Sequence, residues 1–130
     1  MSNIQKPVSG EIEHVVDILH NGGELVPFQE EIFLISLNVA GTSFIKDIEN
    51  LEDELKEGVK LDFYREAKNP YDDRAILIKY LDKKIGYVPQ GSNEILANLM
   101  DAGKYLYGVV VFAKLRDKWL HVRFNAFLKD

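Results

Sequence analysis

Two adjacent side chains, those of Tyr71 and Asp72, could together recognise a nucleotide. They follow Asn69 and Pro70 in a cluster of strong turn-forming residues that runs from Lys68 to Arg74. Because the proline restricts the backbone, the turn would hold an aromatic ring beside a carboxylate. The ring can stack on a base while the carboxylate accepts a hydrogen bond from a hydroxyl group. The same residues could instead serve only to turn the chain between two strands, with the tyrosine covering the end of the fold.

The other groups that could support catalysis or bind a metal are arranged less favourably. His14 and His20 lie six residues apart, on different faces of a helix, and His121 falls in a predicted strand. The acidic run 52–54 could in principle hold Mg²⁺, but a solvated helix face is the better explanation. The sequence contains no nucleophile-elbow, P-loop or dinucleotide-binding motif. We therefore expect a protein that is not an enzyme and that uses no metal ion and no cofactor.

The composition is that of one folded domain. The chain has 130 residues, of which 46% are hydrophobic and 28% charged, and it has no cysteine for a disulfide or a thiolate zinc site. The longest apolar block, 108–113, is far shorter than the ~20 residues of a membrane helix. The first ten residues lack the apolar region of a secretory signal. These features predict a cytoplasmic protein without a membrane segment.

The net charge of −5 argues against nucleic acid as a partner, but the acidic residues are concentrated in two segments. Residues 1–30 carry five acids and one lysine, and residues 47–57 carry six acids and one lysine. From residue 58 to the end, thirteen basic residues outnumber nine acidic ones. The C-terminal half could therefore present a basic face.

Hydrophobic periodicity predicts about six strands and two or three short helices. Alternating or continuous apolar residues predict strands at 33–39, 59–66, 75–80, 85–88, 105–115 and 119–128. In the first of these, Phe33, Ile35, Leu37 and Val39 would share one face. Helices are expected at 11–20, at 48–56 and from an N-cap at Ser92 to Asp101.

These elements lack the regular crossover helices of a parallel sheet. We expect an α+β protein built on a small OB-like or SH3-like β-barrel, closed or partly open, with helices at its ends. Residues 1–30 would form an N-terminal helical extension, and residues 31–130 the barrel domain.

The stretch Phe63–Val88 resembles the HIRAN domain family. Residues 69–72 match the family's NPYD motif, Ala75–Ile76 match its AI pair, and Ile85–Pro89 match its IGYVP element. The resemblance covers about residues 33–128 and is to the free-standing bacterial type of member. It implies a compact OB-like barrel of a kind that is also found fused to chromatin-remodelling helicases.

The resemblance also implies a function. Characterised fused members of the family grip the 3′ end of single-stranded DNA and read its free 3′-hydroxyl, which suggests a role in DNA repair. By position, Tyr71 would stack on the terminal base and Asp72 would accept a hydrogen bond from the 3′-hydroxyl, while its charge would repel a terminal phosphate. The further contacts that the resemblance implies are Phe44, Tyr87, Gln90 and Phe124.

One position departs from the family pattern. DNA-binding members carry an arginine immediately before the aromatic residue that matches Phe44, and this chain has Ser43 there. Other cations could contact phosphate in its place, namely Lys46, Lys60, Lys68 or Arg123. Phe44 and Phe124 could also be ordinary core residues.

A second interpretation keeps the fold but changes the partner. The domain could be a protein-interaction adaptor, with the acidic helices at 11–20 and 47–57 contacting another protein or a helicase. The apolar stripe of Ile12, Val15 and Leu19 would then form the contact. A hydrolase is suggested only by the association with helicases, and the chain has no ATP-binding element of its own. The sequence leaves the oligomeric state open.

Overall fold

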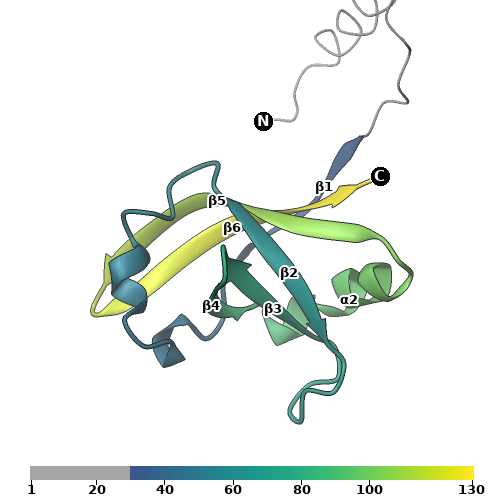
Figure 1. Cartoon of the computed structure of the whole chain (residues 1–130), viewed down its shortest axis with the longest axis horizontal. Helices are drawn as coiled ribbons and strands as arrows, with labels where there is room; N and C mark the ends of the chain where they lie inside the picture. Colours follow the sequence, from purple (N-terminus) through teal and green to yellow (C-terminus); the bar gives the residue numbers. More distant parts are fainter. Residues whose placement is uncertain (1–29) are drawn as a thin grey trace, which may run out of the picture. The chain divides into compact units, whose positions relative to one another are not determined.

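Six antiparallel strands form one sheet in the computed structural model, which describes residues 30–130. The order across the sheet is β1-β6-β5-β2-β3-β4 (Figure 1). The strands are β1 (Glu31–Asn38), β2 (Lys60–Glu66), β3 (Ala75–Tyr80), β4 (Lys83–Tyr87), β5 (Tyr105–Arg116) and β6 (Trp119–Lys129). Each predicted strand is therefore present, with bounds that differ by a few residues at most.

The two edges of the sheet meet at one point. Just beyond β1, Ala40 donates from its backbone N to the Tyr87 carbonyl at 2.8 Å and accepts from the Tyr87 N at 2.9 Å. No ladder of strand pairs continues from this bridge within residues 30–130. The expected barrel is thus correct in part: the sheet curls until its edges touch, but it is not closed by paired strands.

Helix is scarcer than the sequence predicts. The described residues contain one α-helix, α2 (Glu94–Asp101), and three short 3₁₀ helices: η1 (Thr42–Phe44), η2 (Ile48–Leu51) and η3 (Gln90–Ser92). The expected helix at 48–56 is wrong beyond η2, where the chain continues as turns although Leu55 is buried as predicted. On an α-helix the like charge of Glu49 would face those of Glu52 and Asp53, three and four residues on, which disfavours the helix. The predicted helix at 11–20 lies outside the described residues.

The start of α2 also differs from the prediction. Its N-cap is Asn93 rather than Ser92, and the Asn93 side chain makes no capping hydrogen bond. That side chain instead donates to the carboxylate of Asp72 at 2.7 Å. A residue type that usually caps helices is used here to fix the loop between β2 and β3.

A β-bulge changes the faces of β1. The pairing with β6 shifts between Phe33 and Ile35, so Leu34 is an extra residue in the strand. Phe33 pairs with Phe127 on the outer face, whereas Ile35 pairs with the buried Ala126. The expectation that Phe33 and Ile35 share a face is therefore wrong, because alternation holds only while the register is unbroken.

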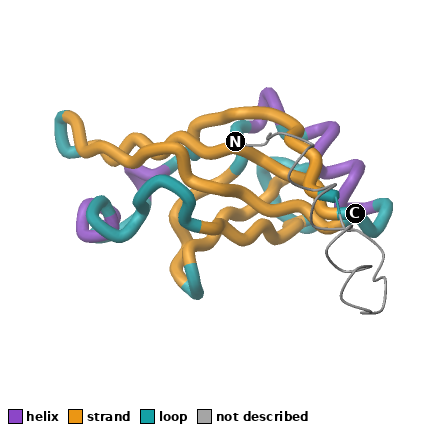
Figure 2. Tube along the Cα trace, turned by 90° about the horizontal axis from the view of Figure 1, so that it is seen from above, coloured by secondary structure: helices purple, strands orange, loops and turns teal. Residues whose placement is uncertain are grey.

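The core lies on the inner side of the curled sheet. Every second residue of β6, from Leu120 to Leu128, is buried, and the η2 region and α2 add side chains to the same cluster. Figure 2 shows the β5–β6 hairpin extending beyond the other strands. Among the described residues no helix is long and apolar enough to cross a membrane.

Candidate nucleic-acid interface

The loop between β2 and β3 is shaped by the side chain of Asn69. Its Oδ1 accepts hydrogen bonds from the backbone N of Tyr71 at 2.9 Å and of Asp72 at 3.2 Å. Its Nδ2 donates to Glu66 Oε1 at 3.1 Å, at the end of β2. This arrangement mimics a backbone turn and ties it to the sheet. Tyr71 is left 91% exposed at the loop's tip.

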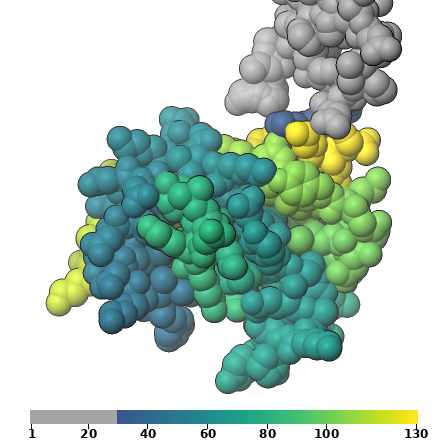
Figure 3. All heavy atoms as spheres, viewed as in Figure 1, coloured from purple at the N-terminus to yellow at the C-terminus, as the bar shows by residue number. Residues whose placement is uncertain are grey.

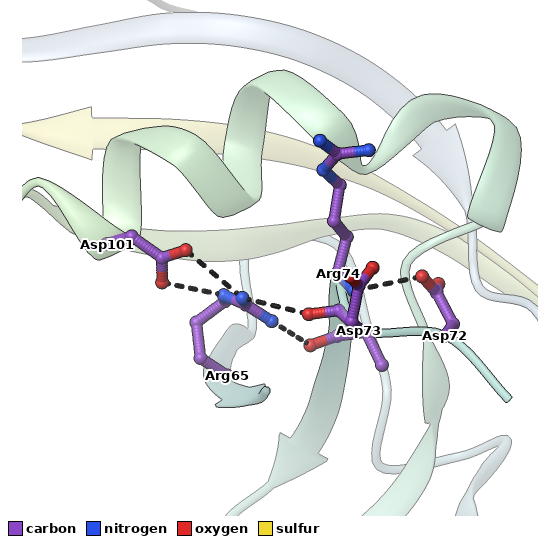
Figure 4. A network of polar contacts seen from close by, with 6 residues as sticks. Arg65, Asp72, Asp73, Arg74 and Asp101 are labelled. Atoms are coloured by element: carbon purple, nitrogen blue, oxygen red, sulfur yellow. Dashed lines mark hydrogen bonds and ion pairs between the residues drawn. The ribbon is translucent and has the colours of Figure 1, made fainter. Parts of the chain in front are cut away.

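A second anchor of this loop is Arg65. Its guanidinium donates to both carboxylate oxygens of Asp101, at 2.9 and 3.1 Å, and to the backbone carbonyls of Ala75 at 2.9 Å and Asp73 at 3.1 Å (Figure 4). The hydrogen bond from Arg65 also lowers the pKa of Asp101. One planar side chain thus joins the C-terminal end of the loop to the end of α2.

Arg65→Met is expected to loosen this loop without unfolding the sheet. Methionine keeps an apolar stem but loses the hydrogen bonds to two carbonyls, each contributing about 1 kcal/mol. We expect the free energy of unfolding to fall by roughly 2 kcal/mol, and the amides of 69–75 to exchange with solvent faster. Urea denaturation and hydrogen exchange measure the two effects. Asp101→Asn is the control: it removes the charge of a side chain that is 55% exposed, keeps an amide oxygen as an acceptor for Arg65 and leaves both carbonyl hydrogen bonds, so its effect should be smaller. Unchanged exchange at 69–75 in Arg65→Met would contradict this anchoring role.

The Asp72 carboxylate is held in a fixed orientation. Its Oδ1 accepts from the backbone N of Arg74 at 2.9 Å, and its Oδ2 accepts from Asn93 Nδ2 at 2.7 Å. A carboxylate has about four lone-pair positions, so each oxygen can accept one further hydrogen bond. Asp72 is therefore a preorganised acceptor that is partly exposed to solvent.

The predicted site residues Tyr71, Asp72, Tyr87 and Gln90 line one cavity of about 400 Å³. The other lining residues are Ala40, Asn69, Pro70, Ala75 and Val88. The cavity therefore forms where the loop after β2 faces the bridge that joins the edges of the sheet. In Figure 3 the loop protrudes at the lower edge of the domain.

Glu66 connects the walls of the cavity. Its Oε1 accepts from the Tyr87 hydroxyl at 2.7 Å as well as from Asn69. Partial burial opposes ionisation of Glu66, but these two hydrogen bonds and the charges of Lys84 and Lys79 outweigh it. The pKa of Glu66 therefore lies below its ordinary value of 4.5.

This lowered pKa predicts a pH dependence of stability. A carboxyl whose pKa is lower in the folded chain stabilises it above the unfolded pKa, and the stabilisation is lost as the pH falls through the folded pKa. Glu66→Gln keeps an acceptor for Tyr87 but removes the charge. We expect the variant to be less stable than the wild type near neutral pH and the difference to disappear in acid. Urea midpoints across the acid range test this; a constant difference would contradict it.

Phe44 lies outside the cavity but is 89% exposed on η1. The 3₁₀ turn is fixed by the buried Thr42, whose hydroxyl donates to the Leu120 carbonyl at 2.7 Å and accepts from the Trp119 indole at 2.8 Å. In Figure 1, η1 is the dark blue turn after β1, at the lower edge of the domain like the loop after β2. Phe44 is therefore not a core residue, and its ring is free to contact a ligand.

Phe124 cannot contact a ligand in this fold, which corrects the prediction for this residue. It is fully buried, and its ring packs edge-on against Phe63 with centroids 5.8 Å apart. Gly108 lies directly beneath both rings, where a Cβ would come within 3.0 Å of Phe63. The residue fills the core because it faces inward on β6, between Val122 and Ala126.

The candidate phosphate contacts are spread over the domain. Lys68 lies in the loop beside the cavity and lines an adjoining hollow with Asn69. Arg123, on β6, donates to the Asn38 side chain at 3.3 Å, and Lys46 is exposed just after η1. Lys60 packs over the rings of Tyr105 and Tyr107 at the start of β2, away from the residues that line the cavity.

Sequence reasoning missed the residues that hold the site in place. Asn69 was visible in the NPYD motif, and its strong tendency to form turns was the available signal. Arg65, Glu66 and Asn93 gave no comparable signal, because their contacts span 8 to 36 residues along the chain.

The comparison with protein families settles the classification. The family model described as the HIRAN domain matches residues 32–129. The chain belongs to the HIRAN domain family. The match covers the six-stranded sheet and the loop that carries NPYD, and the resemblance inferred from the sequence is confirmed. No curated protein matches the chain.

Solved structures show the same HIRAN fold. A protein from Lactobacillus plantarum, solved as a crystal structure, is 29% identical and superposes with a TM-score of 0.72 over 79% of this chain and 99% of its own. The crystal structure of the HIRAN domain of human HLTF is 19% identical, with a TM-score of 0.59 over 76% of this chain and 78% of its own. At that identity, the similarity to the human domain concerns the fold.

Proposed function

We propose that this HIRAN domain is a non-catalytic module that binds single-stranded DNA and recognises a free 3′-hydroxyl end. The observation that carries the proposal is the pairing of an exposed ring with a fixed carboxylate at one cavity. Tyr71 offers a stacking surface, and Asp72 offers free lone pairs to a hydroxyl donor. A terminal phosphate brings no such donor at neutral pH and meets a negative charge.

The construction of the loop supports this proposal. A loop that only reversed the chain would not need Asn69 inside it, Arg65 on β2 and Asn93 at the start of α2 to fix its conformation. Binding sites for small polar groups need this kind of support, because a loosely held carboxylate gains little from one further hydrogen bond. Characterised fused members of the family grip the 3′ end of single-stranded DNA, which favours the same ligand for this free-standing type.

Comparing linear with circular DNA tests whether an end is recognised. The protein is first bound to a labelled linear oligonucleotide. Unlabelled competitors of one sequence, either linear or ligated into a circle, are then added, and fluorescence anisotropy follows the displacement of the label. We expect the circle to compete at least about tenfold more weakly, because it cannot place a terminus in the cavity while the charge of the strand is unchanged. Equal competition by the two forms would contradict end recognition.

The adaptor interpretation receives less support from the described residues. Within the acidic segment 47–57, Glu52 accepts a hydrogen bond from the Leu115 N at 2.8 Å and Glu54 accepts one from the Tyr80 hydroxyl at 3.3 Å. Part of its charge is thus directed at the domain itself. The apolar stripe at 12–19 lies outside the described residues.

A further inference from the structure

The outer face of the β5–β6 hairpin carries a cluster that the cavity does not include. In the antiparallel register, paired residues share a face: Phe112 with Arg123, Lys114 with His121, and Arg116 with Trp119. The residues between them on β6, Leu120 and Val122, are buried, so these six side chains face outward. We name Phe112, Lys114, Arg116, Trp119, His121 and Arg123 the hairpin face.

The hairpin face is basic and aromatic in an acidic protein. It contains three permanent cations and no carboxylate, and within residues 30–130 none of these cations forms an ion pair with a carboxylate. Phe112 and Trp119 are 47% and 49% exposed, and the His121 ring packs on that of Trp119 with centroids 4.6 Å apart. Cations interleaved with exposed rings are the surface chemistry of single-stranded nucleic-acid binding.

Carboxylates border this face without interrupting it. Asp117 lies in the turn at the tip of the hairpin, and Glu52 is held at the edge of β5 by the Leu115 N. The rest of the outer sheet surface is of mixed charge, because its lysines alternate with the acids Glu31, Asp62 and Glu66 on β1 and β2. Lys60, for example, lies 3.9 Å from an Asp62 oxygen.

The hairpin face adjoins the cavity. Beyond β1 the pairing with β6 continues, since the Val39 N donates to the Val122 carbonyl at 2.9 Å. If this register continues by one residue, Ala40 lies beside His121 of β6. On its opposite side, the backbone of Ala40 forms the β-bridge with Tyr87. Ala40 lines the cavity, so a residue of the cavity wall is also the neighbour of His121 on the hairpin face.

We propose that single-stranded DNA held by its 3′ end in the cavity continues across Ala40 and along the hairpin face. Its phosphates would meet Arg123, Lys114 and Arg116, and its bases would stack on the rings of Trp119 and Phe112. The opposite route, over β4 and β3, passes Lys84 and Lys79 but also the carboxylates of Glu66 and Asp62. Charge complementarity therefore selects the hairpin.

The test uses the full chain and a series of oligonucleotides with free 3′-hydroxyl ends, from about two to about sixteen nucleotides, which covers the ~4–16 nucleotides of single-strand sites on OB folds. The variant Lys114→Gln/Arg116→Gln removes two exposed charges from the hairpin face. Lys79→Gln/Lys84→Gln removes the same charge from the opposite route. Thermal melts of both variants show whether they fold as the wild type does.

We expect the affinity of the wild type to rise with the length of the oligonucleotide. The variant Lys114→Gln/Arg116→Gln should bind the longest oligonucleotide about tenfold more weakly than the wild type, and the shortest one equally well. Its salt dependence, the slope of log K against log salt, should fall by about 1.4 for two lost phosphate contacts. A loss confined to Lys79→Gln/Lys84→Gln would overturn the hairpin route.

This inference rests on the proposed function, and the two can fail separately. A wild-type preference for linear over circular DNA, without any effect of Lys114→Gln/Arg116→Gln, would leave end recognition intact and refute the route. Absence of binding by the wild type to every oligonucleotide would refute both.

Discussion

Gly86→Ala is expected to destabilise the domain more than an alanine at any other glycine within residues 30–130. The residue has φ 153°, and a Cβ there would lie 2.5 Å from Val39 Cγ1 and closer still to the Ala40 carbonyl oxygen. The valine can rotate, but the carbonyl cannot move, because its oxygen accepts the hydrogen bond from the Tyr87 N. β4 would have to separate from Ala40, which opens the point where the two edges of the sheet meet.

The expected cost of Gly86→Ala is roughly 2–5 kcal/mol, from overpacking together with an unfavourable backbone conformation. In a domain of this size, that lowers the melting temperature by about 10 °C or more. Gly91→Ala is the matched control: a Cβ there meets no atom within 4 Å, and its φ is not in the left-handed range. Calorimetry of both variants decides the question. A Gly86→Ala protein with the melting temperature of the wild type would contradict a close contact between β4 and Ala40.

The second large effect is expected at Tyr71, on binding and not on stability. Its ring is 91% exposed, so Tyr71→Ala removes almost no packing from the folded chain. The stacking of one base on an aromatic ring contributes roughly 1–3 kcal/mol, so the affinity for single-stranded DNA should fall by about 5- to 150-fold. Tyr71→Phe keeps the stacking surface and should bind almost as the wild type does.

Anisotropy titrations and thermal melts separate these effects for Tyr71. The expected result is an unchanged melting temperature in both variants and a loss of affinity only in Tyr71→Ala. Wild-type affinity in Tyr71→Ala would mean that the exposed ring has no part in binding. A Tyr71→Phe variant as weak as Tyr71→Ala would assign the contribution to the hydroxyl instead of the ring.

The strands were predictable from the sequence because their patterns are local. Alternation in β2 and the apolar run in β3 specify which residues are buried, and both agree with the structure. β1 was predicted less well, since the bulge at Leu34 moves Phe33 to the outer face and no local pattern reveals an extra residue. The helix predicted at 48–56 ends at Leu51. Its apolar spacing fits a longer helix, but that spacing does not show the repulsion of Glu49 with Glu52 and Asp53 three and four residues on.

The cavity was predictable only as far as its motif extends. Tyr71, Asp72, Tyr87 and Gln90 were inferred from a family resemblance, and the structure brings them to one cavity. Phe124 was misplaced because its role was inferred from the family resemblance. The alternation of Val122, Phe124 and Ala126 with polar neighbours already places it on the inward face of β6. The hairpin face was missed altogether, because it depends on the register of two strands and on the path of the chain through Ala40.

The most direct test of the account compares the affinities of one single-stranded oligonucleotide ending in a 3′-hydroxyl or in a 3′-phosphate, for the wild type and for Asp72→Asn/Asn93→Asp. The double variant exchanges the two side chains that are hydrogen-bonded at 2.7 Å, which moves the charge while keeping the partners complementary. We predict that the wild type prefers the hydroxyl end by about tenfold or more, as expected for a hydrogen bond to a charged group. The exchanged variant should fold and lose that preference. Equal affinity of the wild type for the two ends would contradict the claim that Asp72 reads a free 3′-hydroxyl.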